Sequence, residues 1–312
     1  MSMEFSHVPV MLQPCIDALA IKPNGIYVDG TLGRAGHSRE IAKRLKRGRL
    51  ICIDRDQAAL DAAPGRLEGL MDRVTLVHGN FEDLASILDS LNIPAVDGML
   101  FDLGVSSPQL DDASRGFSYM QDAPLDMRMD QTKALDAYQV VNTWAEEELK
   151  RILWLYGEER YSGPIARNIV SKRAEKPIET TLELVDIIKG AMPAAALREK
   201  QHPAKRSFQA IRIAVNDELG AVEKMVADSV PRLNVGGRLA VISFHSLEDR
   251  IVKNGLAEFA KGCTCPPDFP VCVCGKKPII KLTPRKPIVA DAKELEINPR
   301  ARSAKLRVAE KL

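Results

Sequence analysis

Short apolar runs that end in an aspartate are the feature that most constrains how this chain can fold. Asp29, Asp54 and Asp102 each close such a run, and the stretches between the runs carry helical patterns of apolar residues. Strands that are almost entirely apolar, with helices between them, are typical of a parallel sheet covered on both faces. The first part of the sequence therefore predicts an α/β fold. The expected strands are 26–29, 49–54, 74–77 and 96–103.

The alternation stops after the fourth expected strand. Residues 104–135 are rich in Asp, Ser, Gly, Pro and Met and show no clear periodicity. A loop of this length inside a compact domain is usually functional. From 135 to 215 the sequence carries only helical patterns. Helices are expected at 144–156, 163–174, 181–192 and 207–216.

The sheet is expected to resume near the end of the chain. A glycine turn leads into a strongly apolar strand at 234–244, and 303–309 has the pattern of a last strand. We therefore expect a Rossmann-like sheet in a discontinuous domain of residues 1–110 and 213–312. A loop followed by an inserted all-helical domain would occupy 111–212.

Composition narrows the class of protein. Lys and Arg number 44 and Asp and Glu 42, so the net charge of +2 excludes a strongly basic tail that holds nucleic acid by charge alone. Hydrophobic residues at 45% and charged residues at 28% indicate a globular chain. There is no apolar run near the roughly 18 residues of a membrane span and no signal-peptide pattern. With six cysteines, we expect a cytoplasmic protein with reduced thiols and no membrane association.

A glycine-rich turn follows the first expected strand. In a doubly wound sheet, ligands bind beyond the carboxyl ends of the strands. Gly30, Gly33 and Gly36 would let backbone approach a ligand there, and Asp54 lies 24 residues after Gly30, where a carboxylate can accept both ribose hydroxyls of a nucleoside. Phe81 would pack on an adenine ring, or serve as the first core residue of the next helix. The alternative to ligand binding is that the glycines only form a turn.

The glycine spacing favours one adenosine cofactor over others. A nicotinamide enzyme usually shows Gly-x-Gly-x-x-Gly, whereas this chain has Gly-x-x-Gly-x-x-Gly. A phosphate-binding loop would need Gly-Lys-Ser/Thr, which is absent here. S-adenosyl-L-methionine carries no phosphate, so it fits better than a dinucleotide. A nicotinamide-dependent oxidoreductase is the alternative enzyme class.

Several longer segments carry a resemblance to a known family. The segments are 7–12, 29–38, 102–112, 115–118, 122–130, 156–160, 207–212, 243–250 and 298–303. With them the chain resembles the MraW/RsmH family, the ribosomal small-subunit RNA (cytosine-N4)-methyltransferases. The resemblance covers nearly the whole chain. It implies an S-adenosylmethionine-dependent methyltransferase sheet with a helical insert, and a methyl acceptor that is the exocyclic N4 of a cytosine in the decoding region (P site) of 16S ribosomal RNA.

The resemblance also implies a set of cofactor-binding residues. The set is Ala35, Gly36, His37, Asp54, Phe81, Asp102 and Gln109. His37 taken alone would more often be a hydrogen-bonding residue at a helix start, and its contact would run through its backbone. Some family members have glycine where this chain has Ala35. The methyl group should be tolerated there if the backbone is unstrained.

The loop after the fourth strand supplies the candidate catalytic residues. The lone pair of cytosine N4 is delocalised into the ring, so an enzyme must orient the amine and hold it in line with the methyl group. Ser106, Ser107 and the backbone at Pro108 are the candidates, with Asp102 positioning the cofactor or the base pocket. The structural alternative for the two serines is loop and helix capping.

Three further side chains have weaker assignments. Phe117 or Tyr119 would supply a stacking face for a splayed-out base. His245 follows the fifth expected strand, so it should lie at the same end of the sheet. Its two interpretations are RNA or base positioning and a satisfied structural histidine.

A cytosine-C5 methyltransferase would instead need a nucleophilic cysteine beside the pocket. Cys15 precedes the first strand, and Cys52 lies inside the second. Both positions disfavour that chemistry.

Four cysteines gather near the end of the chain in two Cys-x-Cys pairs. Clustered thiols in a reduced compartment predict a structural zinc site, with free thiols or redox-labile pairs as alternatives. They are Cys263, Cys265, Cys272 and Cys274.

Basic residues cluster in three regions that would hold RNA phosphates if they flank one cleft, although any single run is most often a solvated face. The regions are 198–206, 276–286 and 300–307. The expected partner is 16S ribosomal RNA within the small subunit. A monomer and a homodimer both remain open. A non-catalytic RNA-binding assembly factor is the alternative that keeps the nucleoside pocket without turnover.

Overall fold

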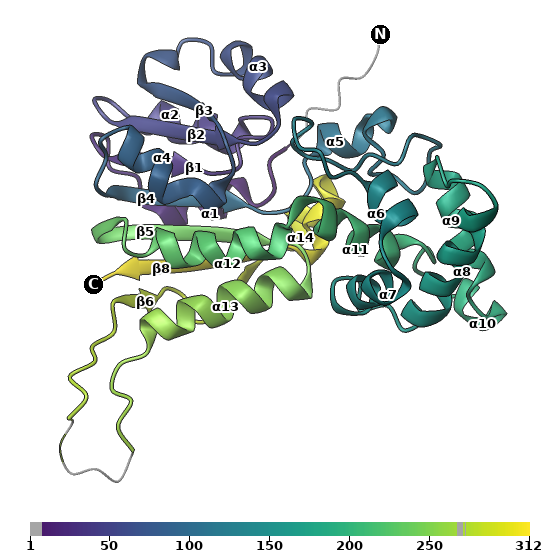
Figure 1. Cartoon of the computed structure of the whole chain (residues 1–312). Helices are drawn as coiled ribbons and strands as arrows, with labels where there is room; N and C mark the ends of the chain where they lie inside the picture. Colours follow the sequence, from purple (N-terminus) through teal and green to yellow (C-terminus); the bar gives the residue numbers. More distant parts are fainter. Residues whose placement is uncertain (1–7, 267–270, 272) are drawn as a thin grey trace. The chain divides into compact units, whose positions relative to one another are not determined.

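The computed structural model describes residues 8–266, 271 and 273–312 and divides the chain into two compact units (Figure 1). The first unit comprises Met1–Gly104 and Leu219–Leu312, and the second is Val105–Glu218. The first contains the whole sheet, and the elements of the second are helical. The predicted fold class, a Rossmann-like sheet with an inserted all-helical domain, is confirmed.

The sheet of the first unit has the strand order β3-β2-β1-β4-β5-β8-β6, and β7 pairs with β8. Its first five strands are parallel, whereas β8 runs antiparallel to β5. The parallel sheet is thus confirmed, and the last strand extends it in the opposite direction. The strands are β1 Ile26–Asp29, β2 Arg49–Asp54, β3 Val74–His78, β4 Val96–Asp102, β5 Leu233–Ser243, β6 Ile280–Leu282, β7 Ile288–Val289 and β8 Lys305–Lys311.

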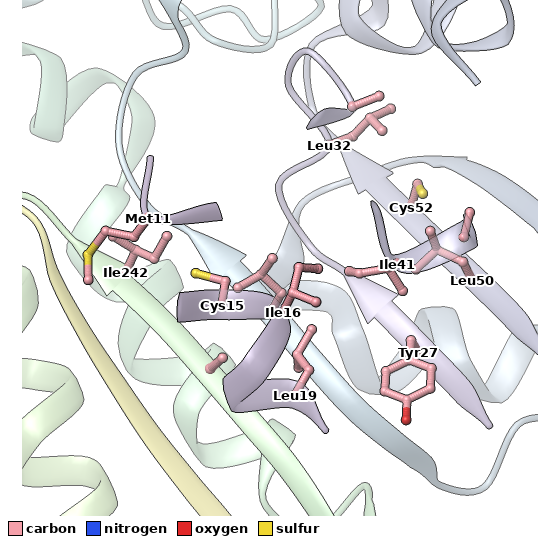
Figure 2. Close-up of a cluster of buried hydrophobic side chains, with 14 of the residues drawn as sticks. Met11, Cys15, Ile16, Leu19, Tyr27, Leu32, Ile41, Leu50, Cys52 and Ile242 are labelled. Atoms are coloured by element: carbon pink, nitrogen blue, oxygen red, sulfur yellow. The ribbon is translucent and has the colours of Figure 1, made fainter. Parts of the chain in front are cut away.

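Helices cover both faces of this sheet, because its central strands are apolar on both sides. In β2, Leu50 and Cys52 pack into one core cluster with α1, α2 and α3, while Ile51 and Ile53 pack into a second cluster with α4, α12 and α13. Figure 2 shows Leu50 and Cys52 in the first cluster. The helices are α1 Leu12–Leu19, α2 Gly36–Arg44, α3 Gln57–Arg66, α4 Leu84–Ser90, α12 Glu218–Ser229, α13 Ser246–Ala260 and α14 Ala292–Ile297.

One helix of the first unit contains a proline. α3 continues through Pro64 and ends two residues later, at Arg66. Asp56 caps the start of this helix by accepting from the backbone N–H of Ala58 at 3.1 Å. Because the proline ring acts on the preceding turn, the helix loses one hydrogen bond and ends soon afterwards.

The second unit packs its helices around a core of its own. Its long irregular stretch is held by polar side chains. The guanidinium of Arg115 donates to the carbonyl oxygens of Arg128 and Met129, and the side chain of Asn216 bonds the backbone of Met127 and Met129. The helices are α5 Ser107–Asp111, α6 Ala137–Thr143, α7 Glu146–Leu155, α8 Ser162–Glu175, α9 Thr181–Gly190, α10 Ala194–Leu197 and α11 Lys205–Asn216.

Among the residues that the structure describes, none of the helices is long and apolar enough to span a lipid bilayer.

Replacing Gly30 by alanine should destabilise the first unit. A Cβ at Gly30 would lie 2.2 Å from a ring carbon of Phe101, and that ring is fully buried. Because a packed core accommodates added volume poorly, we expect the free energy of unfolding to fall by about 1–3 kcal/mol. Urea denaturation measures it. Gly65→Ala is the matched control, since no atom lies within 4 Å of its Cβ position. Equal stability of the two variants would contradict the packing argument.

Candidate active site

Three aspartates lie at the carboxyl edge of the sheet, where adjacent parallel strands end. Asp29 ends β1, Asp54 ends β2 and Asp102 ends β4, and β1 pairs with both neighbours. In such sheets this edge is where ligands bind. The three carboxylates have different surroundings, so they serve different purposes.

Asp29 has a structural role. Its side chain is 1% exposed and accepts from the Ser38 hydroxyl at 2.5 Å and from the backbone N–H of Thr31 at 3.2 Å. Burial raises the pKa of Asp29, and these hydrogen bonds partly oppose that rise. The carboxyl therefore fixes the turn between β1 and α2 and leaves little capacity for a ligand.

Asp54 holds the same turn from the neighbouring strand while remaining partly exposed. One carboxylate oxygen accepts from the backbone N–H of Gly33 at 2.7 Å, and the other accepts from that of Asp56 at 2.9 Å. Burial is the main cause that raises the pKa of Asp54. A carboxylate oxygen has two lone pairs, so each oxygen keeps one for a further donor. The backbone thus orients Asp54 to accept two more hydrogen bonds.

His37 and Asp102 face each other across the edge. His37 Nε2 lies 3.0 Å from the carbonyl oxygen of Val10, and its Nδ1 lies 3.9 Å from Asp102 Oδ2, beyond hydrogen-bond distance. Burial lowers the pKa of His37 to about 4, which leaves the imidazole neutral at pH 7. His37 is therefore tied to the segment before α1 through its ring.

Asp102 has an oxygen that lacks a partner. Its backbone N–H donates to the hydroxyl of Thr31 at 2.6 Å, but its buried Oδ1 makes no hydrogen bond with any described residue. Burial raises the pKa of Asp102 to about 8, helped by the negative charges of Asp29 and Glu248. An unsatisfied buried oxygen costs about 1–3 kcal/mol, which a ligand that donates to it would recover. The site therefore fits an adenosine cofactor with donor groups for Asp54 and Asp102.

The turn between these aspartates carries backbone strain. Ala35 has φ +59°, in the left-handed region that costs an alanine roughly 1 kcal/mol. The condition under which the methyl group of Ala35 was expected to be tolerated, an unstrained backbone, is therefore not met. Gly36 has a packing reason of its own, since a Cβ there would lie 2.1 Å from Pro9 Cγ.

Phe81 belongs to the core of the first unit. Its side chain is 6% exposed, and its ring meets that of Phe101 edge-on with centroids 5.9 Å apart. The guanidinium of Arg55 lies 5.8 Å from the ring centroid of Phe81. Of the two interpretations that the sequence leaves open, burial supports the core residue. A contact with an adenine ring stays a prediction.

The predicted catalytic loop belongs to the second unit and forms a helix cap. The Ser106 hydroxyl accepts from the backbone N–H of Gln109 at 3.5 Å, and Gln109 Oε1 accepts from the backbone N–H of Ser106 at 3.0 Å. Gln109 and Ser107 are buried, while Pro108, in the first turn of α5, is exposed. In this structure Ser106 therefore caps α5, as the structural alternative predicts. The catalytic roles of Ser106, Ser107 and Pro108 and the cofactor contact of Gln109 stay predictions.

The two aromatic candidates for base stacking differ in exposure. Phe117 is 6% exposed, with the Arg115 guanidinium 5.9 Å from its ring centroid. Tyr119 is half-buried, and its ring stacks on that of His202 with centroids 4.6 Å apart. Tyr119 is the better candidate because more of it is accessible.

His245 and Glu248 form the cap of α13 just beyond β5. The backbone N–H of Glu248 donates to His245 Nδ1 at 3.4 Å, and Glu248 Oε2 accepts from the backbone N–H of Phe244 at 2.8 Å. His245 Nε2 lies 3.1 Å from Glu248 Oε1. His245 therefore caps α13 through Nδ1, whereas its buried Nε2 makes no hydrogen bond with any described residue, so the side chain is not fully satisfied within the protein. A role of His245 in positioning RNA or a base stays a prediction. Sequence reasoning missed Glu248, whose charge acts on Asp102, although a Glu three residues after an N-cap is a known capping signal.

Several residues of the predicted basic regions are neutralised within the protein. Lys305 and Arg307 contact Asp249 at 3.0 and 2.6 Å, and Lys281 contacts Glu310 at 2.8 Å. The region 300–307 is therefore less able to hold phosphates than its sequence suggests.

Three of the four predicted zinc ligands lie together in the loop between α13 and β6. The sulfurs of Cys263, Cys265 and Cys274 are all within 4.8 Å of one another. Cys272 lies outside the described residues. Cys15 and Cys52 are fully buried in the core, and burial raises the pKa of both thiols. Burial thus disfavours a nucleophilic role for both.

The chain is similar in sequence to curated proteins over its whole length. The chain is 59% identical over 312 residues to the ribosomal RNA small subunit methyltransferase H of Brevibacillus brevis, covering 100% of this chain and 99% of the relative. The protein of the same name from a Paenibacillus species is 59% identical over 315 residues, covering 99% of this chain and 100% of the relative. The solved structure of a putative rRNA methylase from Clostridium thermocellum gives a TM-score of 0.44 at 13% identity, covering 98% of this chain and 100% of that one. The model of the MraW methylase family matches residues 4–312, and the chain belongs to this family.

Proposed function

We propose that this chain transfers a methyl group from S-adenosyl-L-methionine to the exocyclic N4 of a cytosine in the decoding region (P site) of 16S ribosomal RNA, within the small ribosomal subunit. The observation that carries the proposal is the pair of carboxyl groups at the sheet edge, one oriented by backbone N–H groups and one with a buried oxygen that has no partner among the described residues. The names of the full-length relatives support the RNA substrate.

Each carboxylate suits a different part of the cofactor. Asp54 would accept from the two ribose hydroxyls, because both of its oxygens keep a free lone pair. Asp102 Oδ1 would accept from an amino group of the cofactor, which would satisfy its desolvated oxygen. The backbone of Ala35, Gly36 and His37 would line the cofactor. When bound, S-adenosylmethionine supplies an electrophilic methyl group on a sulfonium.

The chain's own contribution to chemistry is to orient the acceptor. Because the N4 lone pair is delocalised, hydrogen bonds to the amine must turn that lone pair toward the methyl group. Ser106, Ser107 and the backbone at Pro108 are proposed for this role. Asp102 would position the cofactor or base and would not act as a strong base. The methylated nitrogen is acidic after transfer and can lose its proton to water.

The two parts of the chain would have different roles. We propose that the first unit is the methyltransferase domain expected at 1–110 and 213–312, and that the second unit, expected at 111–212, recognises the RNA, with Tyr119 stacking on a base. A ribosomal substrate implies action in the cytoplasm. The cysteine cluster would take no part in methyl transfer. Monomeric and homodimeric forms are both compatible with this reaction.

Methyl transfer to small subunits tests the proposal directly. Subunits from a strain lacking this gene should accept labelled methyl from S-adenosylmethionine, and nucleoside mass spectrometry of the product should give N4-methylcytidine. Subunits from a strain that has the gene are the control, because their site is already methylated. C5-methylcytidine would refute the proposed chemistry. Absence of transfer despite measured cofactor binding would favour another RNA substrate or a non-catalytic assembly role.

A further inference from the structure

Two sulfurs of the cysteine cluster lie at the spacing that a tetrahedral metal requires, and the third lies near both. The Sγ atoms of Cys263 and Cys274 are 3.7 Å apart, and Cys265 Sγ lies within 4.8 Å of both. Four ligands around Zn²⁺ at about 2.3 Å place neighbouring sulfurs about 3.8 Å apart. A disulfide would instead need a sulfur–sulfur distance of about 2.05 Å. The distance between Cys263 and Cys274 matches shared ligation and not a covalent bond between these two sulfurs.

Backbone amides also converge on these sulfurs. The N–H of Thr264 donates to Cys274 Sγ, and the N–H of Cys265 donates to Cys263 Sγ, both at 3.4 Å. These hydrogen bonds orient the sulfurs, as outer contacts of metal ligands commonly do. The loop backbone is thus arranged around the cluster.

The described residues of the loop that carries the cluster form no core. It leaves α13 at Ala260 and returns at β6, where the backbone N–H of Ile279 donates to the carbonyl oxygen of Phe259 at 2.9 Å. None of the described residues in 261–266 and 273–279 is buried, and Val273 is 74% exposed. A segment without buried apolar surface needs another source of order, and a bound metal is the usual one in small loops.

We propose that Cys263, Cys265 and Cys274 bind one Zn²⁺ that orders this loop. Three thiolates and one Zn²⁺ carry a net charge of −1, and Lys261 and Lys276 each stand two residues from a ligand, on either side of the cluster. The exposed position of Cys263 and Cys274 leaves a fourth coordination position open to water or another donor. This site is independent of the methyltransferase reaction.

Metal analysis of the reduced full-length protein tests the proposal. We expect about one Zn²⁺ per chain after dialysis against metal-free buffer. In Cys263→Ser or Cys274→Ser, bound zinc should fall by more than about tenfold, because a thiolate ligand is lost. Thr264→Ala is the matched control, since it keeps all three sulfurs and its backbone N–H, and it should retain the metal. Substitution with Co²⁺ should give thiolate-to-metal charge-transfer bands, which the serine variants should lose.

Two further measurements keep the proposal open to refutation. Zinc should slow alkylation of these thiols, and a chelator should restore the fast rate, while methyl transfer by Cys263→Ser should stay near that of the wild type. The proposal is overturned if zinc content is negligible or unchanged in the serine variants. It is also overturned if reduced protein contains iron and sulfide at these cysteines, or a Cys263–Cys274 disulfide that forms with zinc present.

Discussion

Replacing Asp102 by asparagine will stabilise the folded chain at pH 9 by about 2–4 kcal/mol relative to the wild type, with a much smaller gain at pH 4. Burial raises the pKa of Asp102 from 3.8 to about 8, so the folded protein holds this proton over a range in which the unfolded chain has lost it. The stability that this group contributes is therefore complete below pH 4. It is lost as the pH rises from about 4 to about 8.

The magnitude follows from the size of the shift. A rise in the pKa of Asp102 from 3.8 to about 8 would give an upper limit of about 6 kcal/mol, and partial solvent access reduces it. The side chain is 26% exposed, so we expect roughly half of that limit. Asparagine does not titrate, which means that the difference between the two proteins isolates this carboxyl.

Urea unfolding at pH 4, 7 and 9 measures the effect. Asp83→Asn is the control, because Asp83 is exposed and lies in the same unit. Its difference from the wild type should vary little with pH. A pH-independent difference for Asp102→Asn would contradict the burial of an unpartnered carboxyl at this edge.

Replacing Asp54 by alanine will weaken binding of S-adenosylmethionine by more than about 100-fold. Two hydrogen bonds from ribose hydroxyls to a carboxylate are lost, each worth about 1.5–3 kcal/mol. The backbone N–H groups of Gly33 and Asp56 also lose their acceptor, which loosens the turn. Titration calorimetry gives the affinity.

A modified ligand separates the ribose contact from the loosened turn. A 2′-deoxyribose analogue of the cofactor should bind the wild type at least about tenfold more weakly than the cofactor does, because one hydroxyl is missing. Asp54→Ala should bind both ligands equally. Asp56→Ala is the control, since it removes the cap of α3 and leaves both Asp54 oxygens in place. An equal loss of affinity for the analogue in the wild type and Asp54→Ala would refute the ribose assignment.

The strands were the part of the fold that could be predicted most closely. The ends of β1 and β2 agree with the expected runs to the residue, since a strand buried on both faces must be apolar throughout and polar residues end it abruptly. Helix ends were less exact. Pro64 shows the reason, because the cost of a proline within a helix competes with the packing of Leu60 and Ala63 on the sheet, which keeps the last turn of α3 in place.

Local sequence patterns predicted where the site residues lie but not what each of them does. Asp29, Asp54 and Asp102 were expected at one edge, because parallel strands end together. Their unequal roles could not be foreseen. Both oxygens of Asp29 accept hydrogen bonds from Ser38 and Thr31, whereas Asp102 Oδ1 has no partner among the described residues. Both facts depend on contacts made in three dimensions.

By itself, the sequence determined the alternation of strands and helices, the family, and the edge of the sheet at which chemistry should occur. Periodicity and turn residues are local properties of the sequence, so they can be recognised without knowledge of the fold. Only the tertiary structure decided that Phe81 is core, that Ser106 caps a helix, and that the carboxyl of Asp102 is held near a pKa of 8. Burial and charge at a residue depend on neighbours distant in the chain, such as Glu248 for Asp102, and no local pattern records them.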